Sequence, residues 1–143
     1  MSMNSRFAVA VHILSLLEID KGKRTSSEHI AGSVNTNPVV IRRMMGMLGR
    51  SGLVSTTPGV AGATLTRSPD EITLLDVYRS VQDDPDEGLF AVHERPNPDC
   101  PVGRNIQGAL ESAFVRAQTA MERELASVTL AGVIADIRDK AGA

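Results

Sequence analysis

The sequence predicts a mainly α-helical fold with one small β-hairpin, and three patterns carry this prediction. In residues 4–50, apolar side chains recur at helical spacing in three separate runs. Residues 53–67 change to short β-branched runs around Pro58 and Gly59. After residue 106, apolar residues step by three and four over about six turns, which is the longest regular pattern in the chain. These patterns predict short helices, then a hairpin, then a long C-terminal helix.

The composition is that of one folded domain with an aliphatic core. Of 143 residues, 42% are hydrophobic and 22% are charged, which suits a single modest core. Apolar runs are interrupted well before the roughly 20 residues that a bilayer requires, so we expect no membrane partner and a cytoplasmic location. The aromatic fraction of 3% excludes a stacking surface for single-stranded nucleic acid.

Three helices are predicted in the first fifty residues. The first spans Asn4–Ile19 and carries a broad apolar stripe. The second begins at Thr25, which forms a capping box with Glu28, and ends near residue 34. Asn37 and Pro38 then combine an N-cap with a proline at the first helical position, which predicts a third helix that starts at Pro38 and ends before residue 51.

A hairpin and a fourth helix follow. Residues 53–57 and 63–67 are predicted to be the two strands, with a glycine-containing tip between them. The next helix has two candidate capping boxes, one beginning at Ser68 and one at Thr73. We prefer Thr73 because Ile72 fits the end of a strand, and we expect this helix to end near residue 82.

The remainder is predicted to be a loop followed by two helices. Residues 83–99 are acidic and contain prolines without a sustained period, which is typical of a loop. A helix of roughly 25 residues follows, about 37 Å long. This helix is longer than is needed to cover the small N-terminal unit. Thr129 then caps a short final helix. The expected segments are residues 1–82, a loop at 83–105 and helices at 106–143.

The order helix, helix, turn, helix and two-stranded ribbon is that of a winged helix-turn-helix. In this fold the third helix enters the major groove of DNA, while the ribbon lies along the backbone or reaches the minor groove. Short polar side chains at the start of that helix suit phosphates or bases, and arginine suits guanine or phosphate. The positions we expect to contact double-stranded DNA are Arg6, Asn35, Thr36, Asn37, Val39, Arg42, Arg43, Thr57 and Gly59.

Charge is distributed unevenly along the chain, although the net charge is −2. Eight basic and three acidic residues occur up to residue 67, whereas seven basic and fourteen acidic residues follow. The basic half fits a polyanionic partner. The alternatives are an uneven distribution by chance, a purely capping role for Asn37, and a solvated helix face for Arg42 and Arg43.

Several motifs together resemble a known family. They are IAGSVNTNPVVIRRMMGMLGRSGLVS at 30–55, the glycine-bearing wing, and ITLLDVYRSV at 72–81. With them the chain is similar to the Rrf-two family of bacterial winged helix-turn-helix transcriptional regulators, which includes IscR and NsrR. The stretch HERPNPDCPVG at 93–103 resembles its YwnA-like members.

The resemblance implies a homodimer in which the long helix packs against its counterpart, with a DNA operator as partner. The expected interface positions are Ile106, Leu110, Phe114, Ala117, Met121 and Leu125. Family members that carry an iron–sulfur cluster have three cysteines before this helix, whereas this chain has Cys100 alone. We therefore expect no cofactor and no metal. The wing also departs from the family pattern, since Thr57-Pro58-Gly59 replaces an arginine-bearing stretch.

Cys100 is the remaining chemical feature. It directly precedes the long helix, whose N-terminal dipole favours a thiolate, and Arg104 adds positive charge. The alternative is an inert thiol, because the negative charge of Asp99 disfavours a thiolate at Cys100. A small molecule or an oxidant acting near Cys100 is the expected effector.

These observations favour a homodimeric, sequence-specific transcriptional regulator that acts as a repressor. No carboxylate, histidine and serine arrangement suggests catalysis, so we expect no enzyme. The competing hypothesis is a winged-helix interaction module that regulates an enzyme or a polymerase subunit without specific DNA binding, because a fold does not define a function.

Overall fold

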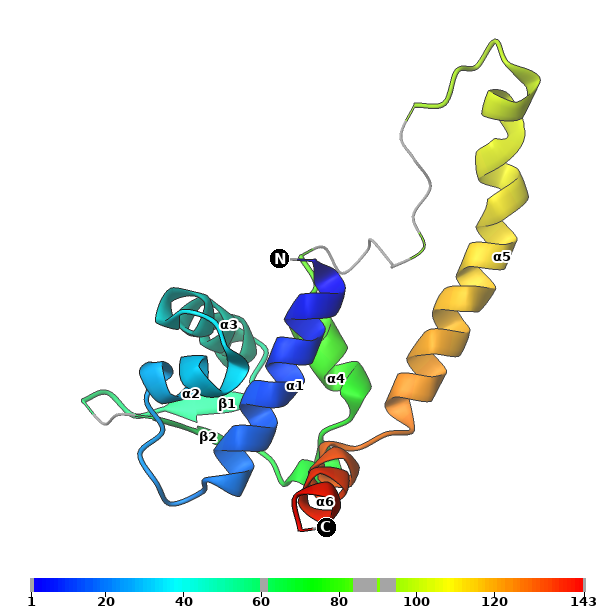
Figure 1. Ribbon diagram of the computed structural model, residues 1–143. Helices are drawn as coiled ribbons and strands as arrows, with labels where there is room; N and C mark the ends of the chain where they lie inside the picture. Colours follow the sequence, from blue (N-terminus) through cyan, green and yellow to red (C-terminus); the bar gives the residue numbers. More distant parts are fainter. Residues whose placement is uncertain (1, 60–61, 84–89, 91–94, 143) are drawn as a thin grey trace.

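The computed structural model describes residues 2–59, 62–83, 90 and 95–142 (Figure 1). Residues 84–89 and 91–94 of the expected loop at 83–105 lie outside them. Within these residues the helices and strands are, in order, α1 Met3–Ile19, α2 Ser27–Val34, α3 Pro38–Arg50, β1 Val54–Thr56, β2 Ala63–Leu65, the short 3₁₀ helix η1 Pro69–Glu71, α4 Leu74–Ser80, α5 Pro101–Ala126 and α6 Leu130–Ala141. The mainly helical architecture with one hairpin and a long C-terminal helix is therefore confirmed.

The core lies between α1, α2, α3, α4, α6 and the hairpin, and it is aliphatic as expected. Its fully buried side chains come from elements spread over most of the chain, which makes one continuous cluster. Burial of each such side chain contributes about 1.5–3 kcal/mol relative to an exposed position. The largest of them are Ile13, Leu14, Ile30, Ile41, Met44, Leu48, Leu53, Ile72 and Leu130.

Side-chain caps fix where the helices begin. Asn37 accepts a hydrogen bond from the Val40 N–H at 3.0 Å, and Thr73 forms the expected capping box with Asp76. For α2 the expectation was wrong by one residue, since Ser26 rather than Thr25 accepts from a backbone N–H. Thr25 is 5% exposed and packs beside the wing, so its more exposed neighbour caps the helix.

The hairpin matches its sequence pattern closely. β1 and β2 pair antiparallel, with Val54 opposite Leu65 and Thr56 opposite Ala63. Gly59 lies in the tip with φ of 78°, a conformation that side chains with a Cβ rarely adopt. This hairpin projects from the helical unit as the wing (Figure 1).

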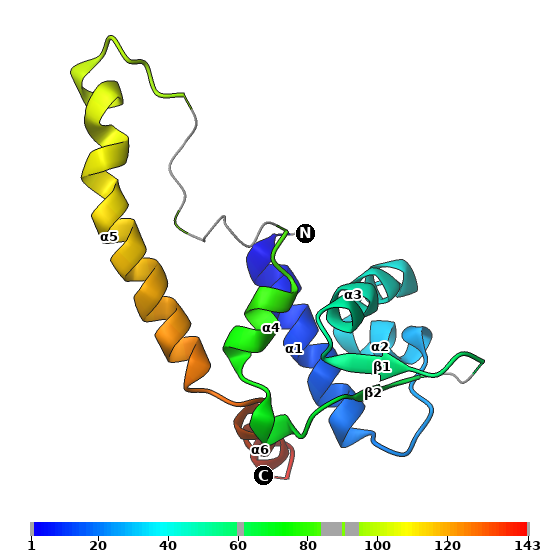
Figure 2. The same ribbon diagram turned by 180° about the vertical axis from the view of Figure 1, so that it is seen from behind.

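The two C-terminal helices, α5 and α6, pack in different places. α5 has 26 residues, about 39 Å at the usual rise, and Figures 1 and 2 show it projecting beyond the winged unit. Near its C-terminal end it packs against α4, where Arg79 lies 3.6 Å from Glu122. α6 instead returns to α1 and η1, and its Leu130 and Ile134 join the core. The segment expected at 106–143 is therefore divided between a projecting helix and a core helix.

None of the helices in the described ranges is long and apolar enough to cross a membrane.

Candidate nucleic-acid interface

The turn between α2 and α3 sets the direction of the third helix. Asn35 ends α2 in the left-handed conformation, with φ of 66° and ψ of 50°. Asparagine tolerates this conformation better than most residues. The N–H of Thr36 donates to the Ala31 carbonyl at 2.9 Å, which closes the turn. The sequence pattern marked Asn35 as a polar contact, and its backbone role adds a second reason for this residue type.

The expected DNA-contacting residues of this turn and helix come together on one exposed surface. Asn35, Asn37, Arg42 and Arg43 are exposed, and Thr36 is half-buried. Val39 is 68% exposed, which leaves an apolar side chain in the first turn of α3 without cover from this chain. Aliphatic groups at such positions contact the methyl group of thymine. We call this set, Asn35–Arg43, the recognition segment.

The two arginines of the recognition segment differ in their surroundings. The guanidinium of Arg42 lies 3.9 Å from a carboxylate oxygen of Glu28, and both side chains are more than half exposed. Such a surface pair contributes at most about 1 kcal/mol, so it does not hold Arg42 in place. Among the described residues Arg43 has no ion-pair partner. Both side chains are therefore available to an incoming polyanion.

The wing supplies a second exposed edge. Thr57, Pro58 and Gly59 are all exposed, and they carry no charge. Backbone N–H groups and the Thr57 hydroxyl are the donors that this stretch offers to phosphates.

Arg6 lies apart from the recognition segment. Its side chain is 13% exposed, its Nε donates to the Val81 carbonyl at 3.2 Å, and its guanidinium is 3.1 Å from the Asp83 carboxylate. These contacts join the start of α1 to the end of α4. Sequence reasoning missed them because Asp83 is 77 positions away along the chain and carries no local signal. A DNA contact by Arg6 stays a prediction.

Cys100 is the N-cap residue of α5 and is partly exposed. The backbone N–H groups of Gly103 and Val102 lower the pKa of its thiol below the ordinary value, because they stabilise the thiolate. Asn97 packs so closely on this turn that a Cβ at Gly103 would collide with its carbonyl oxygen. In Figure 1 this turn lies at the end of α5 that is far from the winged unit.

The expected dimer positions occupy one stripe of α5. Ile106, Leu110, Phe114, Ala117, Met121 and Leu125 are all half-buried. No residue of α5 is fully buried against its own chain. Phe114 contacts Phe90, with ring centroids 5.9 Å apart.

The donor set does not fit an iron centre. The chain has a single cysteine, Cys100, whereas clusters are held by several thiolates. In the part of the chain that the structure describes, no three His, Cys, Asp or Glu residues are grouped closely enough to hold a metal ion.

Taken together, a helix pair joined by a tight turn and followed by a projecting hairpin defines the class of winged helix-turn-helix proteins. Residues 3–136 match the sequence profile of the Rrf2 family, described as iron-dependent transcriptional regulators. The chain belongs to this Rrf2 family of transcriptional regulators, and it is not an enzyme.

The similarity to individual proteins agrees with this family assignment. The chain is 55% identical over 132 residues to YwnA of Bacillus subtilis strain 168, described as an HTH-type transcriptional regulator, with 92% of this chain and 96% of that protein covered. A crystal structure described as that of a DNA-binding protein is 49% identical, with a TM-score of 0.74 over 90% of this chain and 98% of that one. CymR, the global cysteine regulator of B. subtilis, shares the fold at 24% identity and a TM-score of 0.66, with 91% and 93% covered.

Substitutions at Asn37 separate its capping role from a role in binding. Asn37→Ala should lower the free energy of unfolding by about 1 kcal/mol, because the cap is lost. Asn37→Asp keeps a good cap and should leave stability nearly unchanged, yet the new negative charge should weaken binding to duplex DNA. Thermal denaturation and fluorescence anisotropy with labelled duplex measure the two effects. Unchanged DNA affinity in Asn37→Asp would leave Asn37 as a cap alone.

Proposed function

We propose that the protein is a homodimeric, sequence-specific DNA-binding regulator that acts as a repressor. The observation that carries this proposal is the recognition segment, where Asn37, Val39 and Arg43 are exposed together at the start of α3. A positive helix end, a hydrogen-bonding amide, a methyl-contacting side chain and a guanidinium are the groups that read base edges in the major groove. The family membership and the crystal structure of a DNA-binding relative support it.

The length and exposure of α5 support a homodimer. A second copy packed along its apolar stripe would cover side chains that its own chain leaves partly exposed, and closed two-fold symmetry is the common solution for such self-complementary faces. Two winged units would then address half-sites one helical turn or a multiple of it apart, about 34 Å per turn. A dimer bound across an operator excludes other proteins from the same DNA, so repression is the expected sign.

The response to a signal is the third part of the proposal. Hydrogen peroxide would oxidise the Cys100 thiolate to a sulfenic acid. In this step one peroxide oxygen is transferred to sulfur, and the other leaves as hydroxide. An oxidised low-molecular-weight disulfide would instead form a mixed disulfide and release one thiol. A bulkier group at the start of α5 would alter the packing of two such helices and with it the spacing of the recognition segments. A small ligand held near this loop is the alternative effector.

The arginines of the recognition segment provide the first test. Arg43→Ala and Arg42→Ala should each weaken operator binding by about 1–3 kcal/mol and relax specificity at one base pair if the residue reads guanine. If the residue contacts phosphate, affinity should fall on all sequences and the salt slope should decrease by about one. Operators selected from genomic fragments, titrated at several salt concentrations, give both quantities.

Arg138→Ala is the matched control for these variants, because Arg138 is exposed near the end of α6. It should bind the selected duplex like the unmodified protein. If the unmodified protein retains no duplex in a salt-dependent manner, the DNA-binding proposal fails and a winged-helix interaction module takes its place.

The dimer interface is tested on α5. Phe114→Glu should dissociate the dimer, because a charge buried in an apolar seam costs several kcal/mol. Thr119→Glu places the same charge at an exposed position of the same helix and should leave the dimer intact. Light scattering at micromolar concentration measures the molecular mass. A monomeric unmodified protein with no preference for symmetric sites would refute the dimer.

The thiol of Cys100 provides the test of redox response. Because its pKa is lowered, the thiolate persists toward lower pH than for an ordinary cysteine, so labelling by iodoacetamide should remain fast as the pH falls toward neutrality. Mild peroxide should weaken operator binding reversibly in the unmodified protein and have no effect on Cys100→Ser. An equal oxidant response in Cys100→Ser would remove Cys100 from the signal.

A further inference from the structure

A cavity of about 360 Å³ lies beneath the wing, remote from the start of α5. Its walls are the end of α1, the following loop at 21–25, strand β2 and the segment 66–69. Gly22, with φ of 91°, lets the chain reverse after α1 and so forms one side of the cavity. A cavity of this volume is within the usual range of about 300–1,000 Å³ for small-molecule sites.

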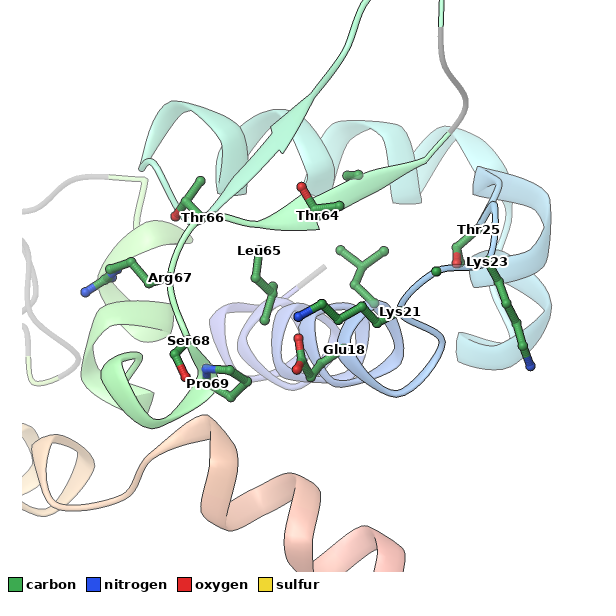
Figure 3. Close-up of a pocket in the computed structure, with 13 residues that line it drawn as sticks. Glu18, Lys21, Lys23, Thr25, Thr64, Leu65, Thr66, Arg67, Ser68 and Pro69 are labelled. Atoms are coloured by element: carbon green, nitrogen blue, oxygen red, sulfur yellow. The ribbon is translucent and has the colours of Figure 1, made fainter.

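The apolar part of the lining comes from two elements. Leu17 of α1 is 5% exposed and Leu65 of β2 is half-buried. Figure 3 shows the Leu65 side chain directed from β2 toward α1, with Pro69 at the adjacent edge. These side chains offer a surface for a short aliphatic group.

The charged part of the lining is one carboxylate and one ammonium group. Glu18 is half-buried and Lys21 is exposed, and both line the cavity. Figure 3 shows both side chains at the α1 side of the cavity, whereas Lys23 and Arg67 extend away from it. Within the described ranges neither Glu18 nor Lys21 has a side-chain ion pair or hydrogen bond. The Glu18 carboxylate and the Lys21 ammonium group are thus available to bind a ligand.

Three other polar side chains of the lining, those of Thr64, Thr66 and Arg67, are already engaged. The Thr66 hydroxyl donates to the Gly52 carbonyl at 2.5 Å, and the Thr64 hydroxyl is 3.4 Å from that of Ser55. Arg67 is 3.6 Å from the Asp76 carboxylate. Recognition of a charged ligand therefore falls to Glu18 and Lys21.

We propose that this cavity binds a small aliphatic zwitterion of the free amino acid type, with its carboxylate on Lys21, its ammonium group on Glu18 and its side chain against Leu17 and Leu65. Such a ligand touches α1 and the wing strand at once. It fastens the wing to the helical unit, and binding stabilises the folded chain by mass action. The consequence for operator affinity rests on the DNA-binding function proposed above, whereas the binding site itself does not.

The binding test uses the full chain without DNA. L-Valine and L-leucine, each added singly at millimolar concentration, are followed by thermal denaturation and by calorimetric titration. Isopentylamine and isocaproate are matched probes, because each keeps the branched aliphatic group of leucine and lacks one of its two charges. We expect at least one of the two amino acids to raise the melting temperature, and neither single-charge probe to do so.

Substitutions of lining residues test whether the amino acid binds in this cavity. Glu18→Gln and Lys21→Gln should each weaken binding about tenfold, since a hydrogen bond to a charged group is lost. Neither should change the melting temperature of the free protein, because neither side chain has a partner in the described chain. Lys23→Gln is the control, since Lys23 lines the cavity and extends away from it, and it should bind the ligand normally.

Three outcomes would overturn the binding site. They are no binding of either amino acid, equal binding of a single-charge probe, and equal loss of binding in Lys23→Gln. Operator affinity with the ligand at saturation forms a separate arm: a changed affinity supports an effector role, and an unchanged affinity refutes that role alone. A chain that binds the amino acid and no duplex would refute the DNA-binding function while the site stands.

Discussion

A backbone crossing beside Ile72 and Leu130 joins the winged unit to the C-terminal helices. The Leu130 N–H donates to the Ile72 carbonyl at 2.8 Å, and the Leu74 N–H donates to the Val128 carbonyl at 2.9 Å. Between them Thr73 and Thr129 face each other as an antiparallel bridge, and each of these threonines caps the helix that follows it. The crossing thus fixes the starts of α4 and α6 and the end of α5 at one place. Ile72 and Leu130 are both fully buried, so the hydrogen bond between them is shielded from water.

Because the crossing anchors only the C-terminal end of α5, the rest of that helix is available for other contacts. The anchored end packs on α4 and is joined to it by the Arg79 and Glu122 pair. The other end, with Cys100, projects away from the core (Figure 2). A stiff helix of about 39 Å turns a small change at one end into a displacement of the body attached to the other. Under the proposed redox response, the core helices α1, α3 and α4 would carry that displacement to the recognition segment without deforming, since close-packed cores are stiff.

The features predicted from the sequence were those with local causes. Caps at Asn37, Thr73 and Thr129 act between residues three positions apart, so residue types alone reveal them. The cap of α2 was placed one residue early, because Thr25 and Ser26 are both residue types that cap helices and the burial of Thr25 beside the wing leaves Ser26 as the cap. The return of α6 to the core depends on contacts between Leu130 and residues near position 72, which periodicity does not encode. The exposed turn and helix start at residues 35–43 were predictable because helix caps and polar residues coincide there, and their contact with DNA stays a prediction. The cavity joins residues 17–25 to 63–69 and leaves no sequence signal.

The two candidate signalling points would act on different geometric quantities. In the proposed dimer, a group added at Cys100 would change the packing of the two long helices, and this would alter the distance between the two recognition segments. A ligand beneath the wing acts within one subunit, because its contacts end at α1, the loop at 21–25 and β2. The first kind of signal changes which half-site spacing is preferred, while the second changes the affinity for each half-site and leaves the preferred spacing alone. Operators with inserted or deleted base pairs between half-sites therefore distinguish the two signals, since only a shift in preferred spacing requires movement through α5.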